Sequence, residues 1–247
     1  MPRIYVSKND IIEKKAVLEG DNANHISRSL RMRVGDEITL CDGERTDYRC
    51  TVEKMTSDKV YLEINEKMPS EGEPPYRARL FMALPKSDKM EMIVQKAVET
   101  GIYEIIPFIS ERCISRPDER SGDKKVERWN KIAQSAAEQC GRGIIPRVGR
   151  IVSYKRALEM AMEDRTGFIC YEREKERGIY QGLLPLTKEP SLEGISFFVG
   201  AEGGFSEEEV KAAIDVGIVP LSLGRRILRC ETAPIFVLSV MSAMLEK

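Results

Sequence analysis

A glycine-rich turn is the first feature of the sequence whose residue types and spacing could do chemistry. Residues 199–206, VGAEGGFS, follow the apolar run ISFF, and residues 200–204 contain three glycines around Glu202. Glycines let backbone amides approach a ligand closely, and the N-terminus of a following helix favours electron-rich groups. A carboxylate inside such a turn is costly to bury unless it has a partner. The turn therefore indicates a ligand site, although a purely structural connection between a strand and a helix is the alternative.

A second segment with chemical potential is LSLGRRILRCETA, residues 221–233. An apolar run ends at Gly224, arginines flank the pair Ile227 and Leu228, and Glu231 precedes Thr232, a suitable N-cap for a final helix. This mixture fits a cleft with an apolar floor and an anionic ligand. The alternative is an exposed arginine-rich connector that Thr232 caps.

Strands and helices that alternate after residue 75 are expected to position these two segments. Apolar runs predict strands at residues 79–84, 102–110, 166–172, 194–202 and 219–224. Helices are expected from an N-cap at Ser87 to the stop at Gly101, and over residues 124–140. A capping box at Ser206 and Glu209 predicts another helix directly after the glycine-rich turn.

This alternation is typical of an α/β fold with a parallel sheet covered on both faces. Ligands of such sheets bind beyond the carboxyl ends of the strands. The glycine-rich turn and residues 221–233 are therefore expected at one edge of the sheet. Weaker candidates for the same edge are Cys170, Tyr171 and Glu172, which end another strand.

The first part of the chain, through residue 69, has a different pattern. Period-two alternation in EITLCDG and KVYLEI, broken by turn residues, predicts a small antiparallel sheet or barrel. Residues 69–75, PSEGEPP, are polar and proline-rich and indicate a linker. Within the first part, residues 25–36 carry His25, Arg28 and Arg31 before any acid, which indicates a local RNA contact despite the net charge of -1. A solvated helix end is the alternative.

Composition excludes several classes of protein. The sequence starts without a secretory apolar region and has no run of roughly 18 apolar residues, so we expect a cytoplasmic protein without a membrane span. The six cysteines are far apart with no C-x-x-C pair, which argues against a metal site or a disulfide framework. Because His25 is the single histidine and no nucleophile motif surrounds it, covalent hydrolase chemistry is disfavoured.

Four motifs in order carry a resemblance to a known family. These are KSDKMEMIVQKAVETG, RWNKIAQSAAEQCGR, VGAEGGFSEEE and LSLGRRILRCETA, preceded by HISRSLRMRVGDEITLCDG. Together they resemble the RsmE family of small-subunit ribosomal RNA (uracil-N3)-methyltransferases, which belong to the SPOUT class, over nearly the whole chain. One departure is Ala201, where the family has proline, and this loses some rigidity of the turn.

The resemblance implies a fold and a cofactor. Residues 1–70 are expected to form a PUA-like β-barrel that binds RNA, and residues 71–247 a SPOUT methyltransferase domain with a parallel sheet and a deep trefoil knot. S-adenosylmethionine is expected to sit in the knot loops, and the chain to form a homodimer through the knot region. The residues implied to bind the cofactor are Val199, Gly200, Glu202, Gly203, Gly204, Leu221, Leu223, Gly224, Ile227 and Leu228.

The candidate catalytic residues lie beside the second of these loops. We expect Glu231 to accept the uracil N3 proton and Arg229 to stabilise an anionic base or a phosphate. The alternative for Glu231 is a carboxylate that favours a helix N-terminus. Expected contacts to ribosomal RNA, or to the small ribosomal subunit, are Arg3, His25, Arg28, Arg31 and Arg142; the alternative for Arg142 is an arginine that faces a helix dipole.

Rival functions differ in testable ways. A non-catalytic RNA-binding assembly factor would keep the fold without binding the cofactor, and Ala201 is its one sequence hint. A dinucleotide enzyme would need an early G-x-G-x-x-G unit, which the sequence lacks. A related SPOUT enzyme acting on another RNA is separated only by the family resemblance.

Overall fold

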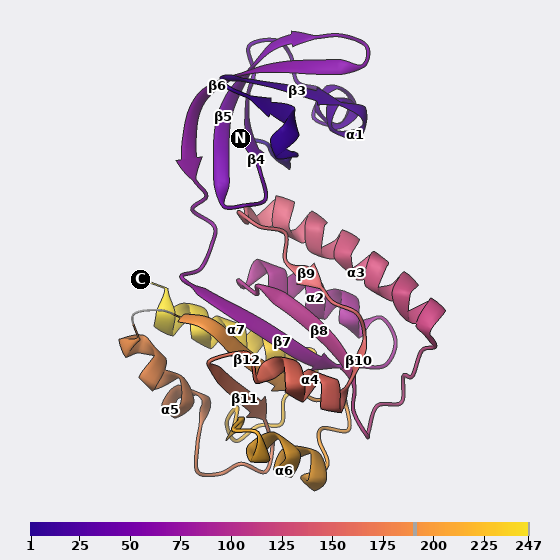
Figure 1. Cartoon of the computed structure of the whole chain (residues 1–247), viewed down its shortest axis with the longest axis vertical. Helices are drawn as coiled ribbons and strands as arrows, with labels where there is room; N and C mark the ends of the chain where they lie inside the picture. Colours follow the sequence, from indigo (N-terminus) through magenta and orange to yellow (C-terminus); the bar gives the residue numbers. More distant parts are fainter. Residues whose placement is uncertain (190–191, 247) are drawn as a thin grey trace. The chain divides into compact units, whose positions relative to one another are not determined.

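The chain forms two compact units in the computed structural model, which describes residues 1–189 and 192–246 (Figure 1). The first unit comprises Met1–Glu73 together with Ala137–Ile145, and the second comprises Pro74–Ala136 together with the chain from Pro146 onward. The end of one long helix and the loop after it therefore cluster with the N-terminal segment, which the sequence pattern did not indicate.

The first unit is built on a six-stranded sheet. Its strands are β1 (Arg3–Tyr5), β2 (Ile11–Ile12), β3 (Lys15–Glu19), β4 (Glu37–Cys41), β5 (Thr46–Met55) and β6 (Lys59–Pro69), in the order β1-β4-β5-β6-β3-β2. All pairings are antiparallel except β1 with β4, so the predicted antiparallel sheet is confirmed for most of the unit. The short helices η1 (Lys8–Asp10), α1 (Gly20–Asn24) and η2 (His25–Ser29) complete it.

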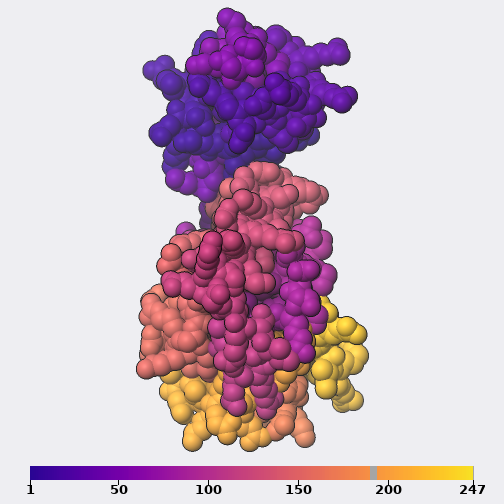
Figure 2. Space-filling view, turned by 90° about the vertical axis from the view of Figure 1, so that its right-hand side faces the viewer, coloured from indigo at the N-terminus to yellow at the C-terminus, as the bar shows by residue number. Residues whose placement is uncertain are grey.

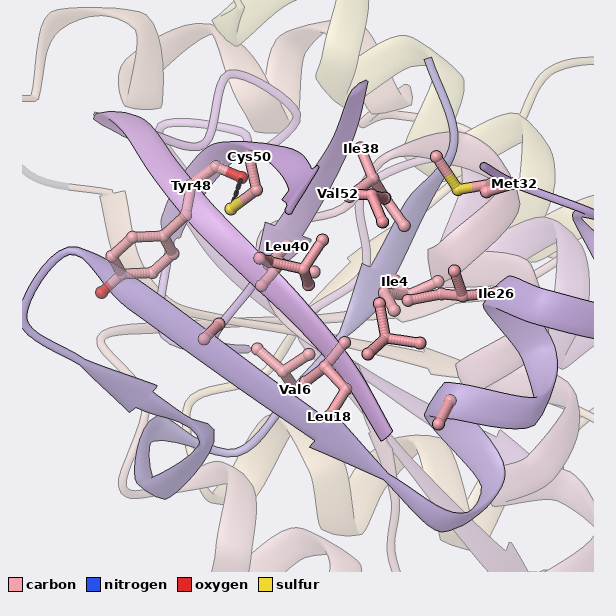
Figure 3. Close-up of a cluster of buried hydrophobic side chains, with 14 residues drawn as sticks. Ile4, Val6, Leu18, Ile26, Met32, Ile38, Leu40, Tyr48, Cys50 and Val52 are labelled. Carbon is pink, nitrogen blue, oxygen red and sulfur yellow. Dashed lines mark hydrogen bonds between the residues drawn. The ribbon is translucent and has the colours of Figure 1, made fainter. Parts of the chain in front are cut away.

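The core of this unit follows from the alternation of apolar residues along the strands. Ile38 and Leu40 of β4 and Val52 of β5 are almost fully buried, because neighbouring positions in a strand point to opposite faces. Figure 3 shows their side chains with Ile26, which η2 contributes to the same cluster. One face of the sheet is thus apolar and holds η2 in place.

The second unit contains a parallel sheet. Its strands are β7 (Tyr76–Ala83), β8 (Glu104–Ile109), β9 (Arg147–Val148), β10 (Val152–Ser153), β11 (Thr166–Cys170), β12 (Leu192–Val199) and β13 (Val219–Leu221). Their order is β10-β8-β7-β12-β11-β13, β9 pairs with β8, and every pairing is parallel. The predicted α/β fold with a parallel sheet is confirmed. The trefoil knot stays a prediction.

Helices lie on both sides of this sheet in the view of Figure 1, with α4 in front and α2 and α7 behind. The helices are α2 (Lys89–Glu99), α3 (Glu119–Cys140), α4 (Tyr154–Ala161), α5 (Ile179–Leu183), η3 (Leu184–Lys188), α6 (Glu207–Asp215) and α7 (Thr232–Leu245). In Figure 2 the side on which α3 lies faces the viewer. None of the helices in the described ranges is long and apolar enough to cross a membrane.

Two predicted helix starts are wrong and one is displaced. Ser87 does not cap α2: its φ is 56°, and the helix begins two residues later at Lys89 after Asp88. Thr232 is the first residue of α7, whereas Glu231 occupies the N-cap position. Helix α3 begins before residue 124 because Asp118 accepts a hydrogen bond from the Ser121 amide (2.8 Å) and starts the helix early. The capping box of Ser206 and Glu209 at α6 is confirmed.

The strand order decides where a ligand can bind. Strands β12, β11 and β13 are consecutive neighbours in the sheet, and their carboxyl ends at Val199, Cys170 and Leu221 lie at one edge. The glycine-rich turn, residues 170–172 and the arginine-rich loop begin at these three ends. The candidate segments of the sequence are therefore brought together, as expected.

Candidate functional site at the carboxyl edge of the parallel sheet

A cavity of about 540 Å³ opens at this edge of the sheet. That volume falls in the usual range for small-ligand pockets, about 300–1,000 Å³. The residues around it follow three neighbouring strands or begin α2 and α7, and they are Lys89, Cys170, Tyr171, Glu172, Val199, Gly200, Ala201, Glu202, Gly203, Gly204, Leu223, Gly224, Arg225, Arg226, Ile227, Leu228, Arg229, Cys230 and Ala233.

The glycine turn is folded too tightly for larger side chains. A Cβ on Gly200 would lie 2.9 Å from the Gly204 Cα, and a Cβ on Gly203 would lie 2.9 Å from the Arg112 Cβ. Gly204 has a φ of 61°, which favours glycine, and its Cα faces the Glu172 carboxylate. Arg112 donates a hydrogen bond to the Gly203 carbonyl (2.9 Å) and fixes the turn from outside. The glycines thus bring backbone to the wall of the cavity.

One lysine joins the two loops that border the cavity. Lys89, the first residue of α2, places its Nζ 2.8 Å from Glu202 Oε1 and 3.5 Å from Glu231 Oε2. The Glu202 carboxylate also accepts a hydrogen bond from the Lys86 amide (3.2 Å). Cys230 donates its thiol hydrogen to Glu231 Oε2 (3.2 Å). Both carboxylates are therefore held by groups from other segments.

These contacts keep the acids ionised and the thiol neutral. Desolvation raises the pKa of Glu202, but the hydrogen bond from Lys89, the backbone hydrogen bonds and the charge of Lys89 together outweigh it and leave the pKa below its ordinary value. For Glu231, desolvation is likewise outweighed, here by the hydrogen bond from Cys230 and the charge of Lys89, so its pKa is also lowered. Hydrogen bonding to Glu202 raises the pKa of Lys89. Burial raises the pKa of Cys230 to about 12.

The structure brings most of the predicted cofactor residues to the cavity. Those that line it are Val199, Gly200, Glu202, Gly203, Gly204, Leu223, Gly224, Ile227 and Leu228. Leu221 is fully buried in β13, where its side chain would contact a Cβ added to Gly182, and it does not line the cavity. Its contribution is to hold the strand from which the loop departs.

The arginine-rich loop is more exposed than expected. Ile227, predicted as part of an apolar wall, is 86% exposed, and only Leu228 is partly covered. Arg225, Arg226 and Arg229 are also exposed and line the mouth of the cavity. The loop therefore offers positive charge and one apolar side chain at the entrance.

Lys89 is the site residue that sequence reasoning missed. A signal was present, because Lys89 follows a strand end and occupies the first position of a helix. The partial positive charge of a helix N-terminus disfavours an ammonium group there, so a lysine in this position is stabilised by a carboxylate partner. The glycine turn supplies that carboxylate through Glu202.

The predicted RNA contacts of the first unit fall into two groups. His25, Arg28 and Arg31 are exposed around the end of η2, where Arg31 adopts a φ of 54°. Arg3, in contrast, is largely covered and donates hydrogen bonds to Asp47 (2.7 Å) and to the Arg142 carbonyl. Of these residues, His25, Arg28 and Arg31 are exposed enough to contact a large ligand.

Arg142 lies inside the first unit, which does not support the predicted RNA contact. Its side chain is 4% exposed and its Nε lies 2.8 Å from Glu73 Oε1. The same carboxylate accepts hydrogen bonds from the amides of Gly143 (2.7 Å) and Ile144 (3.2 Å). A buried guanidinium of this kind holds the residues after α3 to the segment after β6. The predicted linker is thus packed in place at Glu73.

Comparison with known proteins identifies the family. A family model described as an RNA methyltransferase domain matches residues 72–242, and one described as an RNA methyltransferase PUA domain matches residues 18–65. The ribosomal RNA small subunit methyltransferase E of Bacillus subtilis is 33% identical over 98% of this chain and 96% of its own length. The chain belongs to the ribosomal RNA small subunit methyltransferase E family.

Solved structures of similar proteins share the whole fold. The ribosomal RNA small subunit methyltransferase E of Neisseria gonorrhoeae, bound to S-adenosyl methionine, has a TM-score of 0.82 at 31% identity and covers 98% of this chain and 97% of that one. A putative methyltransferase of Legionella pneumophila in complex with the same cofactor also gives 0.82 and 31%, over 98% and 96% of the two chains. The two-unit architecture is therefore that of the methyltransferase E family.

Metal chemistry finds no support in the side chains. No group of three or more His, Cys, Asp or Glu that could hold a metal ion occurs within residues 1–189 and 192–246.

Proposed function

We propose that this chain transfers a methyl group from S-adenosylmethionine to N3 of a uridine in small-subunit (16S) ribosomal RNA. The observation that carries the proposal is the cavity at the carboxyl ends of β11, β12 and β13, which is built from the residues implied by the family resemblance. Two relatives with the same fold bind S-adenosylmethionine, and the curated relatives are named for small-subunit ribosomal RNA.

The donor set of the cavity fits this cofactor. Gly200 and Gly204 of the tight turn line the cavity, so backbone forms part of its wall. The Glu172 carboxylate lines the same wall and can face a cationic amino group or ribose hydroxyls. Because S-adenosylmethionine carries a positively charged sulfonium, a carboxylate in the wall such as Glu172 would interact favourably with it. When bound, the cofactor supplies an electrophilic methyl group.

Residues beside the cavity are suited to accept the proton that N3 of the uracil must lose. Glu231 is ionised, because its pKa is lowered, and its carboxylate contacts Lys89 and Cys230, two residues that line the cavity. We assign it the role of accepting the N3 proton, after which the nitrogen lone pair attacks the methyl carbon and the sulfur leaves as a neutral thioether. Arg229 at the mouth stabilises the anionic base oxygens or a neighbouring phosphate.

Recognition of the RNA is assigned to the N-terminal domain, residues 1–70, and the chemistry to residues 71–247. The exposed His25, Arg28 and Arg31 would contact the RNA backbone, which positions a substrate without reading its sequence. A base inside an RNA duplex cannot reach the cavity, so the target uridine is expected in a loop or single strand.

A homodimer through the knot region completes the proposal. It is supported by Ile227, whose large apolar side chain is 86% exposed beside the cavity, where a second copy would shield it from water. Partly covered apolar residues of α7, such as Ile235 and Phe236, are further candidates for the same contact. Because its substrate is ribosomal, we expect the protein to work in the cytoplasm.

The proposal is tested by transfer of label from S-adenosylmethionine to RNA. Small ribosomal subunits that lack their native methylation are incubated with the protein, with large subunits and transfer RNA as competing acceptors. Label should enter only the small-subunit RNA, and Gly200→Val should abolish it because the new side chain would collide with the Gly204 backbone. Label in another RNA would contradict the proposed substrate. Absence of cofactor binding would instead favour a non-catalytic assembly factor.

A further inference from the structure

Lys89 connects three parts of the chain that are distant in sequence. It begins α2, it contacts Glu202 of the glycine turn, and it contacts Glu231 at the start of α7. The Lys89 and Glu202 side chains are each 31% exposed and that of Glu231 is 13% exposed, so solvent screens the three charges only in part.

The charges of Lys89, Glu202 and Glu231 compensate one another. An ammonium at the N-terminus of α2 is opposed by the helix dipole, and the two carboxylates compensate for it. Without the ammonium, Glu202 and Glu231 would repel each other as like charges, which favours the uptake of a proton by one of them. The groups that surround this cluster are the neutral Cys230 thiol, the Glu172 carboxylate across the cavity, and Arg225, Arg226 and Arg229 at its mouth.

We propose that Lys89 is a positioning residue that ties the glycine turn to the loop ending at Glu231 and so gives the cofactor cavity its bound shape. This inference rests on the proposed function, since it deepens the role of the same cavity. Lys89 acts through Glu202 and Glu231 and need not touch the reacting atoms.

Binding of S-adenosylhomocysteine, measured by calorimetry without RNA, tests the proposal. In Lys89→Met the two loops are no longer joined, so affinity should fall about tenfold. Lys89→Arg keeps a cation in reach of both carboxylates and should recover most of the affinity. Lys96→Met is the matched control: it removes a lysine that pairs with Glu99 (2.8 Å) on the same helix, away from the cavity, and should bind as the unchanged protein does.

The pH dependence of binding separates positioning from a general loss of packing. In the unchanged protein the pKa values of Glu202 and Glu231 are lowered, so affinity should be flat between about pH 5.5 and 8. In Lys89→Met one carboxylate should titrate within this window. Affinity should then recover as the pH falls, because protonation removes the repulsion between the two loops.

A double-mutant cycle provides the second readout. Glu202→Ala and Lys89→Met remove the same link, so the double variant should lose far less affinity than the product of the two single losses. The same cycle is read from thermal unfolding without ligand, which keeps it informative if the protein binds no cofactor. If the unchanged protein does not bind the cofactor, the proposed function is contradicted, but the role of Lys89 is not. Independent effects of the two substitutions, or a Lys89→Met variant that binds normally with a flat pH profile, would overturn the role of Lys89.

Discussion

At the scale of single residues, the cavity contains two thiols that are poor nucleophiles. Burial raises the pKa of Cys170 to about 12, and burial with the hydrogen bond to Glu231 does the same for Cys230. The thiolate is the reactive form of cysteine, and it is scarce when the pKa lies far above neutral pH. Transfer to a ring nitrogen needs no enzyme nucleophile, so inert thiols agree with the proposed reaction.

We therefore predict slow alkylation of Cys170 and Cys230 by iodoacetamide at pH 8. At that pH only about one thiol in 10⁴ is ionised when the pKa is near 12. Reactivity should rise only as the pH climbs toward the raised pKa. Mass spectrometry of tryptic peptides gives the rates, with a small thiol peptide as the reference. Modification of either cysteine as fast as the reference would contradict the assigned protonation state.

Glu231→Gln tests the proposed proton acceptor. The glutamine keeps an oxygen near Lys89 but accepts a proton far less readily, so kcat should fall about 100-fold. Affinity for S-adenosylmethionine should stay within about threefold, because only the charge of one side chain changes. Single-turnover methylation at saturating RNA measures the first quantity and calorimetry the second. Normal turnover by this variant would remove Glu231 from the mechanism.

At the scale of elements, the periodicity of the sequence was sufficient for the strands and helices that bury one face. Helix α2 buries one face at helical spacing, and Trp129 of α3 is 4% exposed; the buried residues of α2 are Met90, Ile93, Val94, Ala97 and Val98. Helix starts were less predictable, since Asp88 and not Ser87 occupies the N-cap of α2, and Asp118 accepts a hydrogen bond at an earlier start of α3. Short elements such as α4, β9 and β10 were missed because periodicity needs a longer window.

The ion pair between Glu73 and Arg142 is the clearest contact between distant segments that could not be predicted from the sequence. Arg142 matched a family motif and was interpreted as an RNA contact, yet 69 positions of sequence separate it from the carboxylate that buries it. Long-range pairs of this kind leave no periodic signal. The predicted cofactor residues that line the cavity stand next to strand ends, where a local rule applies.

Arg142→Met should destabilise the protein by about 3–5 kcal/mol, because Glu73 is left buried without its cation. Lys131→Met is the matched control: it breaks an exposed pair with Glu127 on α3 and should cost less than about 1 kcal/mol. Urea unfolding gives both free energies. If affinity for RNA falls while stability stays unchanged in Arg142→Met, the structural role assigned to this arginine is wrong.

At the scale of the whole molecule, the division of labour between the two units follows from where charge is exposed. The net charge of -1 gave no hint of RNA binding, whereas local exposure of Arg28 and Arg31 in the first unit does. The second unit exposes Arg225, Arg226 and Arg229 at the mouth of the cavity. Each unit thus presents cations suited to one part of an RNA substrate.

Replacing His25, Arg28 and Arg31 together by alanine should weaken binding to small-subunit RNA and flatten its salt dependence. The slope of log affinity against log salt should fall by about 2, roughly one for each arginine that contacts a phosphate. Lys15→Ala with Lys59→Ala is the control, because it removes two cations of the same unit that pair with Glu53 and Glu19. Filter binding over a salt series measures both. An unchanged slope in the first variant would exclude these residues from the RNA interface.

The central claim, that the product is methylated at N3 of uridine, is tested most directly by identifying the modified nucleoside. Unmethylated small ribosomal subunits are treated with the protein and deuterium-labelled S-adenosylmethionine. The RNA is then digested, and the nucleosides are separated and identified by mass spectrometry. We expect labelled 3-methyluridine from the unchanged protein. The Gly200→Val variant should give none. Label in any other nucleoside, or none despite measurable cofactor binding, would contradict it.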